Sequence, residues 1–283
     1  LLMELEHSTL KNLDSKFFIY FKKALYLRAF FYAYFWLVLY FLLSLNKKMI
    51  KEDIHKLLFI DIETVGVDED LDSLHHTNPK LSKVWDETGW DYFKRKYSED
   101  SELSSNEMFI KRSALLPEFG KIVCISVGFI LPNGETKLDS FYGEETDILE
   151  RTYDLLNKVD KLGFLVCGHN VKNFDLPYIA KRMLINGISI PKILPNYSIK
   201  PWESRVLDTK EVWGFNSFGG LSSLNLVCTA LGLETSKEGE VNGSNMHKYY
   251  YDNSNKNGLD KIKNYCEEDV KCTINLVKKL KNL

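Results

Sequence analysis

The chain reads Lys56-Leu57-Leu58-Phe59-Ile60-Asp61-Ile62-Glu63-Thr64 where an apolar run leads directly into two acidic residues. A short run of this kind predicts a buried β-strand that ends at Asp61. Because side chains alternate along a strand, Asp61 and Glu63 are expected on the same face. Two carboxylates on one face repel each other, and a divalent cation between them would offset that repulsion. On its own, the pattern also fits an ordinary polar strand end.

Apolar patterns further along the chain predict more strands and helices. The expected strands are 121–129, 137–142 and 164–167, and turn residues at 132–134 join the first two as a hairpin. The expected helices are 148–159, 175–186 and 259–280. A hairpin followed by strands that alternate with helices favours one α/β domain over residues 49–283. We expect a mixed central sheet flanked by helices.

A second polar cluster follows the strand expected at 164–167. It reads Gly168-His169-Asn170-Val171-Lys172-Asn173-Phe174-Asp175 and leads into the next expected helix. The free N–H groups and the dipole of a helix N-terminus stabilise a carboxylate, so Asp175 fits a helix cap as well as a metal ligand. His169 is interpreted as a structural residue, because no other residue here completes a histidine-based site.

A third cluster lies within the expected C-terminal helix and reads Tyr265-Cys266-Glu267-Glu268-Asp269. Tyr265 and Asp269 are four residues apart, so they share a helix face beside the apolar stripe. Glu267 and Glu268 point elsewhere on the helix and are expected to be solvated. The alternative is an acidic helix surface with a tyrosine at the edge of the core.

The three clusters together favour a site for divalent metal ions. Four carboxylates on separate elements, with no histidine or cysteine among the ligands, are typical of sites for Mg²⁺ or Mn²⁺. Two such ions about 3.5–4 Å apart can promote an in-line displacement at phosphorus. The chain has 37 Lys and Arg residues against 39 Asp and Glu residues, which excludes nucleic-acid binding through a diffuse basic surface. Bound metals would instead supply the positive charge that faces phosphate.

The five cysteines do not indicate a disulfide scaffold or a cysteine-rich zinc site. Their number is odd, and no two of them have the CxxC spacing. They are interpreted as reduced, buried thiols of a cytoplasmic protein.

These clusters resemble the motifs of the DEDD superfamily of 3′–5′ exonucleases, which have a ribonuclease H-like fold. The segment Asp61-Ile62-Glu63-Thr64 is similar to the first motif. The residues that match the second and third motifs, N-x₃-F-D and Y-x₃-D, are Asn170, Phe174, Asp175, Tyr265 and Asp269. Asn264 stands where the histidine branch has its histidine, so the chain resembles the tyrosine branch, called DEDDy.

The resemblance implies a role for each matching residue. Asp61 would bridge two divalent ions, either Mg²⁺ or Mn²⁺. Glu63 and Asp269 would complete the site of the ion that carries the attacking water. Asp175 would serve the second ion, and Tyr265 would orient the water through its hydroxyl. The residues implied to contact the substrate are Asn170, Phe174 and Thr64.

Other stretches resemble a group of stand-alone bacterial proteins, which are predicted 3′–5′ exonucleases related to the proofreading domain of family B DNA polymerases. These stretches are 117–128, 186–188, 200–203 and 207–209, and the resemblance covers about 57–280. It implies hydrolysis of single-stranded nucleic acid from the 3′ end to nucleoside monophosphates, with DNA favoured over RNA by analogy. Phe174 fits a core residue equally well. Asp208 has no place among the four acids and is interpreted as a structural residue or a support for a ligand.

The insert at 67–116 has two interpretations. Aromatic residues interleaved with basic ones are typical of a platform for single-stranded nucleic acid. Acidic residues among them favour instead a solvated helical lid with buried tryptophans. The aromatic and basic residues are Trp85, Trp90, Tyr92, Lys80, Lys83, Lys94, Arg95, Lys96, Lys111 and Arg112.

Residues 1–48 differ in composition from the rest and are treated as an N-terminal extension. Residues 29–45 are 17 consecutive uncharged and mostly apolar residues, which is the lower limit for a membrane helix. One interpretation is an apolar helix outside the fold that anchors the protein in the inner membrane. Another is translated upstream sequence with Met49 as the true start, which predicts a cytoplasmic protein. A soluble helix is the third.

Two other classes of function remain as alternatives. A non-catalytic nucleic-acid-binding module could share the fold, but the presence of all four acids and the tyrosine favours an enzyme. A membrane-anchored protein could carry the same domain on its cytoplasmic side if residues 1–48 are translated. The sequence predicts 3′ ends of single-stranded DNA or RNA as partners and no particular protein partner.

Overall fold

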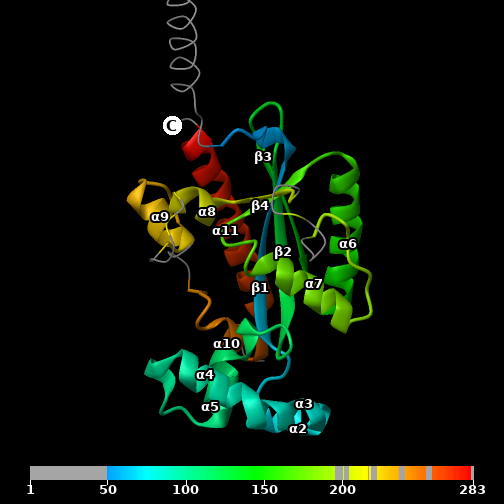
Figure 1. The fold of residues 1–283 in the computed structure, drawn as a ribbon, viewed down its shortest axis with the longest axis vertical. Helices are drawn as coiled ribbons and strands as arrows, with labels where there is room; N and C mark the ends of the chain where they lie inside the picture. Colours follow the sequence, from blue (N-terminus) through cyan, green and yellow to red (C-terminus); the bar gives the residue numbers. More distant parts are fainter. Residues whose placement is uncertain are drawn as a thin grey trace, which may run out of the picture. The chain divides into compact units, whose positions relative to one another are not determined.

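A five-stranded sheet lies at the centre of the compact unit Glu52–Leu283 (Figure 1). Its spatial order is β3-β2-β1-β4-β5, with antiparallel pairing on the β2 side of β1 and parallel pairing on the β4 side. The strands are β1 (Leu57–Gly66), β2 (Gly120–Ile130), β3 (Thr136–Tyr142), β4 (Leu165–Gly168) and β5 (Val206–Asp208). The predicted mixed sheet and the predicted hairpin of β2 and β3 are confirmed.

The computed structural model describes residues 50–194, 200, 204–215, 217, 222–235, 240–252 and 257–281. The predictions for residues 1–48, for the apolar segment 29–45 and for most of the stretch 200–203 fall outside these described residues. Within the described ranges, no helix combines the length and the apolar character needed to cross a membrane.

Helices cover both faces of the sheet (Figure 1). α11 packs against β1, β2 and β3 on one face, while α6 packs against β2 and β3 on the other and also contacts α7. The helices around the sheet are α6 (Glu145–Lys161), α7 (Asp175–Ile185), α8 (Thr209–Gly214), α9 (Leu224–Ala230), α10 (Met246–Tyr251) and α11 (Gly258–Lys281). The three predicted helices correspond to α6, α7 and α11 and are confirmed.

Successive side chains of β1 point alternately to the two faces of the sheet. Asp61 and Glu63 have one parity and lie on the face that α11 covers. The residues of the other parity are buried in the main core beneath α6 and α7 and include Leu58, Ile60 and Ile62. The strand that carries the two acids is therefore anchored by its apolar face.

β1 continues past the two acids, so the prediction that the strand ends at Asp61 is wrong. The reason is its pairing with β2, which continues as far as Gly66. The register shifts between Glu63 and Thr64, which marks a β-bulge in the pair. Both acids therefore lie within a paired strand, because the pairing with β2 begins before Asp61 and continues after Glu63.

The insert between β1 and β2 forms helices around an aromatic core of its own. Trp85 is fully buried there, and its ring is edge-on to Phe109 and Phe119 at centroid distances of 5.0 and 5.1 Å. The α-helices of the insert are α2 (Leu71–Thr77), α3 (Pro79–Val84), α4 (Trp90–Lys96) and α5 (Ser105–Arg112). The prediction of a helical insert with a buried tryptophan is confirmed.

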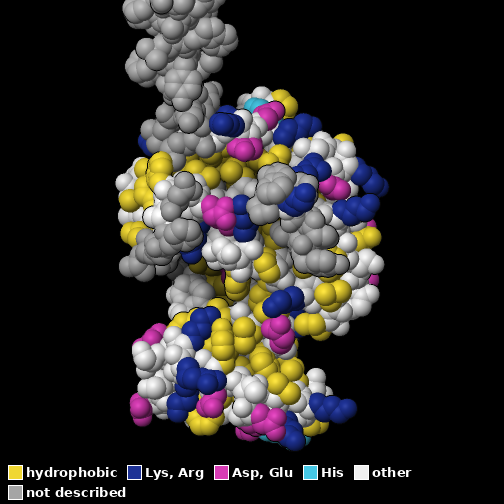
Figure 2. Space-filling view, in the orientation of Figure 1, with side chains coloured by type: hydrophobic (Ala, Val, Ile, Leu, Met, Phe, Trp, Pro, Cys, Tyr) yellow, Lys and Arg dark blue, Asp and Glu magenta, His cyan; other side chains and the backbone are white. Residues whose placement is uncertain are grey.

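Charged side chains of both signs are scattered over the surface of this insert, between apolar and uncharged groups (Figure 2). Two of its basic residues, Lys111 and Arg112, form ion pairs with Asp100, which is only 2% exposed. A third, Lys94, lies over the ring of Trp90 at 4.7 Å. These cations are engaged within the insert itself, and its contact with nucleic acid stays a prediction.

Candidate active site

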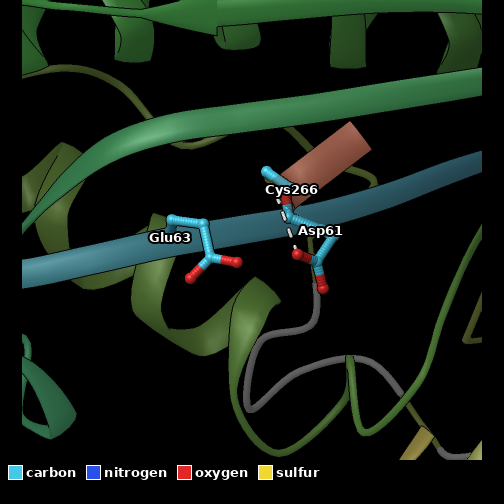
Figure 3. Close-up of side chains that lie close together, drawn as sticks. All are labelled: Asp61, Glu63 and Cys266. Atoms are coloured by element: carbon cyan, nitrogen blue, oxygen red, sulfur yellow. Dashed lines mark hydrogen bonds between the residues drawn. The ribbon is translucent and has the colours of Figure 1, made fainter. Parts of the chain in front are cut away.

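Asp61 and Glu63 extend from the same side of β1 (Figure 3). Glu63 is 9% exposed and Asp61 is half-buried. One oxygen from each carboxylate and the Sγ of Cys266 all lie within 4.8 Å of one another. The prediction that the two carboxylates share a face is confirmed.

Cys266 brings a thiol to this pair from α11 (Figure 3). Its Sγ lies 3.4 Å from the backbone oxygen of Asp61 and 3.6 Å from Asp61 Oδ2. Cys266 is thus an additional neighbour of Asp61 beside the predicted carboxylates, and a ligand set made of oxygen donors alone stays a prediction. Cys266 falls on the apolar stripe of its helix, and that signal predicts burial without predicting which strand the thiol meets.

Asp175 joins the two acids from the first turn of α7. Its side chain is 4% exposed, and its Oδ1 accepts a hydrogen bond from the backbone N–H of Ile62 at 3.2 Å. Ile62 lies between Asp61 and Glu63 in the chain, so this bond sets Asp175 beside the pair. The cap position itself is occupied by Phe174. Asp175 is therefore more than a helix cap, because its carboxylate contacts the strand that carries the other acids.

The acids shift one another's pKa. Burial is the largest cause for Asp61 and Glu63, and the charge of Asp269 is the next, so the pKa of both carboxyls lies well above the usual range. Burial likewise raises the pKa of Asp175 to about 7, and the charges of Asp208 and Asp269 add to the shift. These groups therefore bind protons more tightly than ordinary carboxyls do, and a divalent cation would compete with those protons when it binds.

The described residues offer these buried acids no basic partner. No Lys, Arg or His within the described ranges forms an ion pair with Asp61, Glu63 or Asp175. Buried carboxylates are normally paired or bound to a metal. The donor set, in which oxygen predominates, thus fits a hard divalent ion such as Mg²⁺ or Mn²⁺.

α11 supplies Tyr265 and Asp269 one turn apart, as predicted. Both side chains are half-buried. Tyr265 also lines a cavity of about 540 Å³ along α11, which Asn264 and Lys271 border as well. Tyr265 therefore borders open space next to the helix turn that carries Cys266 and Asp269.

Glu267 is not solvated, and that prediction is wrong. Its Oε1 accepts a hydrogen bond from Ser140 Oγ at 2.8 Å and pairs with Lys263 Nζ at 3.0 Å. Ser140 Oγ lies 2.9 Å from Ser126 Oγ, and Ser126 is directly opposite Asp61 in the β1–β2 register. Helical spacing alone carries no information about Ser140, which reaches this side of α11 from β3.

The loop 168–174 carries the predicted substrate residues Asn170 and Phe174. Asn170 is half-buried and has φ of +66°, in the left-handed region that asparagine tolerates better than most residues. Phe174 packs against the main core, with its ring 5.5 Å from that of Tyr178. Phe174 is thus at least partly a core residue, and nucleotide contact stays a prediction for both.

His169 is a structural residue, as predicted. Its Nδ1 lies 2.9 Å from Thr209 Oγ1, and its Nε2 lies 2.6 Å from the backbone oxygen of Ser222. Burial lowers the pKa of His169, which favours the neutral ring. Both ring nitrogens already have partners, so the ring ties the loop to neighbouring segments.

Thr64 connects β1 to the end of the insert. Its Oγ1 donates a hydrogen bond to the backbone oxygen of Ala114 at 3.0 Å, and the hydroxyl of Tyr178 donates to the same oxygen at 3.0 Å. The threonine hydroxyl therefore has a structural partner, and its predicted contact with substrate stays a prediction.

Comparison with known protein families assigns the chain. Residues 114–281 match the family described as "Predicted 3'-5' exonuclease related to the exonuclease domain of PolB". The chain belongs to this family. The part of the chain that matches this exonuclease family includes Asp175 and Asp269. Asp61 and Glu63 precede that part and belong to the site through β1, the central strand. Membership supports a nuclease, and hence a hydrolase.

A solved structure supports the ribonuclease H-like fold of this exonuclease family member. It is the family B DNA polymerase from the hyperthermophilic archaeon Pyrobaculum calidifontis, with 17% sequence identity and a TM-score of 0.50. The similarity covers 79% of this chain and 24% of the polymerase chain, so the chain spans about a quarter of that protein. At this identity the similarity concerns the fold. No protein with a curated description matches the sequence.

Proposed function

We propose that this exonuclease hydrolyses single-stranded DNA from the 3′ end to nucleoside monophosphates, with two divalent metal ions as cofactors. The observation that carries the proposal is the convergence of acids from three elements. Asp61 and Glu63 come from β1, Asp175 comes from α7, and Asp269 on α11 interacts electrostatically with all three. Carboxyls gathered in this way, three of which (Asp61, Glu63 and Asp175) form no ion pair among the described residues, favour a metal-dependent enzyme over a binding module.

Mg²⁺ and Mn²⁺ suit the carboxylate oxygens of this site. Following the DEDD resemblance, Asp61 would take part in holding both ions, Glu63 and Asp269 would help to hold one of them, and Asp175 would help to hold the other. When bound, the ions would activate a water molecule and stabilise the leaving oxygen. The Cys266 thiol is a soft donor, so hard ions would rely on the carboxylates.

Residues of the chain would orient the reacting groups. Tyr265 would hold the attacking water through its hydroxyl, which can donate a hydrogen bond without losing its proton. Asn170 and Thr64 would contact the terminal nucleotide, and Phe174 would support it from the edge of the core. Fixed groups of this kind contribute by holding the water and the phosphorus in line before reaction.

The family relation supports DNA as the substrate, and RNA is the alternative. The two differ at the 2′ position, so a contact there would decide between them. A cytoplasmic location suits an enzyme that acts on DNA ends and is part of this proposal. Anchoring to a membrane through residues 29–45 is the alternative location.

A labelled oligonucleotide tests the proposed activity. Purified protein would be incubated with 5′-labelled single-stranded DNA in Mg²⁺, in Mn²⁺ and in EDTA. We expect a ladder that shortens from the 3′ end with either metal and an intact oligonucleotide in EDTA. An RNA oligonucleotide of the same sequence would be run in parallel. The proposal would be contradicted if neither the DNA nor the RNA oligonucleotide is cut in the presence of Mg²⁺ or Mn²⁺.

A further inference from the structure

Asp208 is a buried acid outside the proposed metal site. It ends β5, where the parallel pairing places it opposite Gly168, the last residue of β4. Its side chain is 2% exposed. A carboxylate removed from water in this way needs hydrogen-bond donors to remain charged.

Backbone N–H groups supply those donors. Oδ1 accepts hydrogen bonds from the N–H of Asn170 and the N–H of Lys210, both at 2.9 Å, and Oδ2 accepts one from the N–H of Lys172 at 3.0 Å. Charge-assisted bonds of this kind are stronger than neutral ones. Two of the three donors belong to the loop between β4 and α7, so the carboxylate of Asp208 binds that loop directly.

The same bonds hold Asn170 in its left-handed conformation. Residues other than glycine adopt this region at a cost, which is smaller for asparagine than for most, so the surroundings help to maintain it. Lys210 adds a side-chain contact, with Nζ 3.3 Å from Asn170 Oδ1. Asp208 and Lys210 therefore fix both the backbone and the side chain of Asn170.

Hydrogen bonds within the loop connect the backbone of Asn170 to the start of α7, where Asp175 lies. The backbone oxygen of Asn170 accepts hydrogen bonds from the N–H groups of Asn173 and Phe174, at 3.1 and 3.0 Å. The next residue is Asp175, whose carboxylate meets Ile62 on β1. A shift of Asn170 would therefore move the first turn of α7 and the carboxylate that it carries.

A second set of hydrogen bonds, independent of Asp208, also holds the loop between β4 and α7. Thr209 Oγ1 donates a hydrogen bond to the backbone oxygen of Gly168 at 3.1 Å, and His169 bonds Thr209 and Ser222. These contacts hold the start of the loop, whereas Asp208 holds its centre. Loss of the Asp208 carboxylate should therefore displace Asn170 and Asp175 without unfolding the domain.

Building on the proposed function, we infer that Asp208 is a positioning residue that holds Asn170 and Asp175 in place for metal and substrate. Its two oxygens are occupied by backbone donors, so it acts through the loop. Residues that orient metal ligands in this way typically change metal affinity or activity by roughly 10- to 100-fold when they are replaced.

Two substitutions of Asp208 distinguish the effect of where its oxygens lie from the effect of its negative charge. Asp208→Asn keeps the shape but places an amide N–H against a backbone donor, while Asp208→Glu keeps the charge and displaces the oxygens by one methylene. Mn²⁺ binding would be measured from the electron paramagnetic resonance signal of the free ion, and circular dichroism would verify the fold. We expect both variants to bind Mn²⁺ about 10-fold or more weakly at one site. Hydrolysis should fall in parallel and recover partly at high Mn²⁺.

Arg205 provides a matched control just before the other end of β5. Its Nη1 pairs with Asp160 Oδ1 at 2.6 Å, and its Nη2 donates to the backbone oxygen of Phe164 at 2.9 Å. Arg205→Gln should lower the melting temperature and leave Mn²⁺ affinity unchanged. This comparison distinguishes a positioning role from general loss of stability.

The outcomes discriminate between the inference and the proposed function. Wild-type Mn²⁺ affinity in Asp208→Glu would overturn positioning in favour of a charge effect, and wild-type affinity in both variants would overturn the inference entirely. Weakened Mn²⁺ binding in a protein that cuts neither DNA nor RNA would uphold positioning and reject the exonuclease. A wild-type protein that binds no Mn²⁺ would overturn both.

Discussion

The carboxylate of Asp175 accepts a hydrogen bond from the backbone N–H of Ile62 at 3.2 Å. Ile62 lies between Asp61 and Glu63, and its own side chain is buried on the opposite face of the sheet. One backbone group thus fixes the distance between the acid of α7 and the acid pair of β1. This contact converts two separate sequence motifs into one site.

Asn substitutions at the acids should abolish hydrolysis without weakening the metal-free fold. Asp61→Asn and Asp175→Asn each remove a charge from a crowded acidic site, so the melting temperature in EDTA should stay level or rise. Activity should fall at least about 100-fold, because replacing a direct metal ligand lowers activity more than replacing a residue that only orients a ligand. Glu118→Gln, which changes an exposed residue paired with Lys181, should leave the rate unchanged. Near-normal turnover in either acid variant would reject the site assignment.

Stability without metal should fall as the pH rises from about 4 to about 7. The pKa of Asp61, Glu63 and Asp175 is raised, so the folded state binds more protons than the unfolded state across this window. The free energy of unfolding therefore decreases with pH, and urea midpoints in EDTA should be higher at pH 5 than at pH 8. Saturating Mn²⁺ should remove the difference. The same slope in Asp61→Asn as in wild type would show that other groups cause it.

Tyr265→Phe should slow hydrolysis and leave metal binding intact. The side chain borders open space beside the turn that carries Asp269, and the substitution removes only its hydroxyl. Loss of orientation of the attacking water should lower kcat by about 10- to 100-fold. Tyr153→Phe on α6 serves as the control and should have wild-type kcat. An unaltered kcat in Tyr265→Phe would show that the hydroxyl does not position water.

Trp85→Ala should destabilise the insert strongly. The indole is fully buried and packs edge-on against Phe109 and Phe119, the last of which directly precedes β2. Truncation of such a side chain costs about 3–5 kcal/mol through lost burial and an unfilled cavity. Urea unfolding followed by circular dichroism measures the change. A loss below about 1 kcal/mol would mean that the insert does not unfold together with the sheet.

Local patterns were sufficient for most of the fold. Strand alternation placed Asp61 and Glu63 on one face, and helical spacing placed Tyr265 and Asp269 one turn apart. Both patterns depend only on residues close in sequence. The end of β1 was predicted wrongly, because the pairing with β2 that extends the strand to Gly66 is a long-range property.

Contacts between distant segments account for the rest of the errors at the site. Cys266 reaches Asp61 from about 200 positions along the chain, and no local pattern encodes that meeting. Glu267 accepts a hydrogen bond from Ser140 of β3, and the helical pattern alone does not indicate this contact. The sequence favours a structural or supporting role for Asp208, but its backbone partners depend on the fold of the neighbouring loop.

The number of Mn²⁺ ions bound per chain tests the central claim most directly, because the account depends on four carboxylates that hold two divalent ions. The count would come from electron paramagnetic resonance titration of wild type and of Asp175→Asn, with Glu118→Gln as the control. We predict two ions for wild type and for the control, and one tightly bound ion for Asp175→Asn. No bound ion in wild type, or two equally tight ions in Asp175→Asn, would contradict the account.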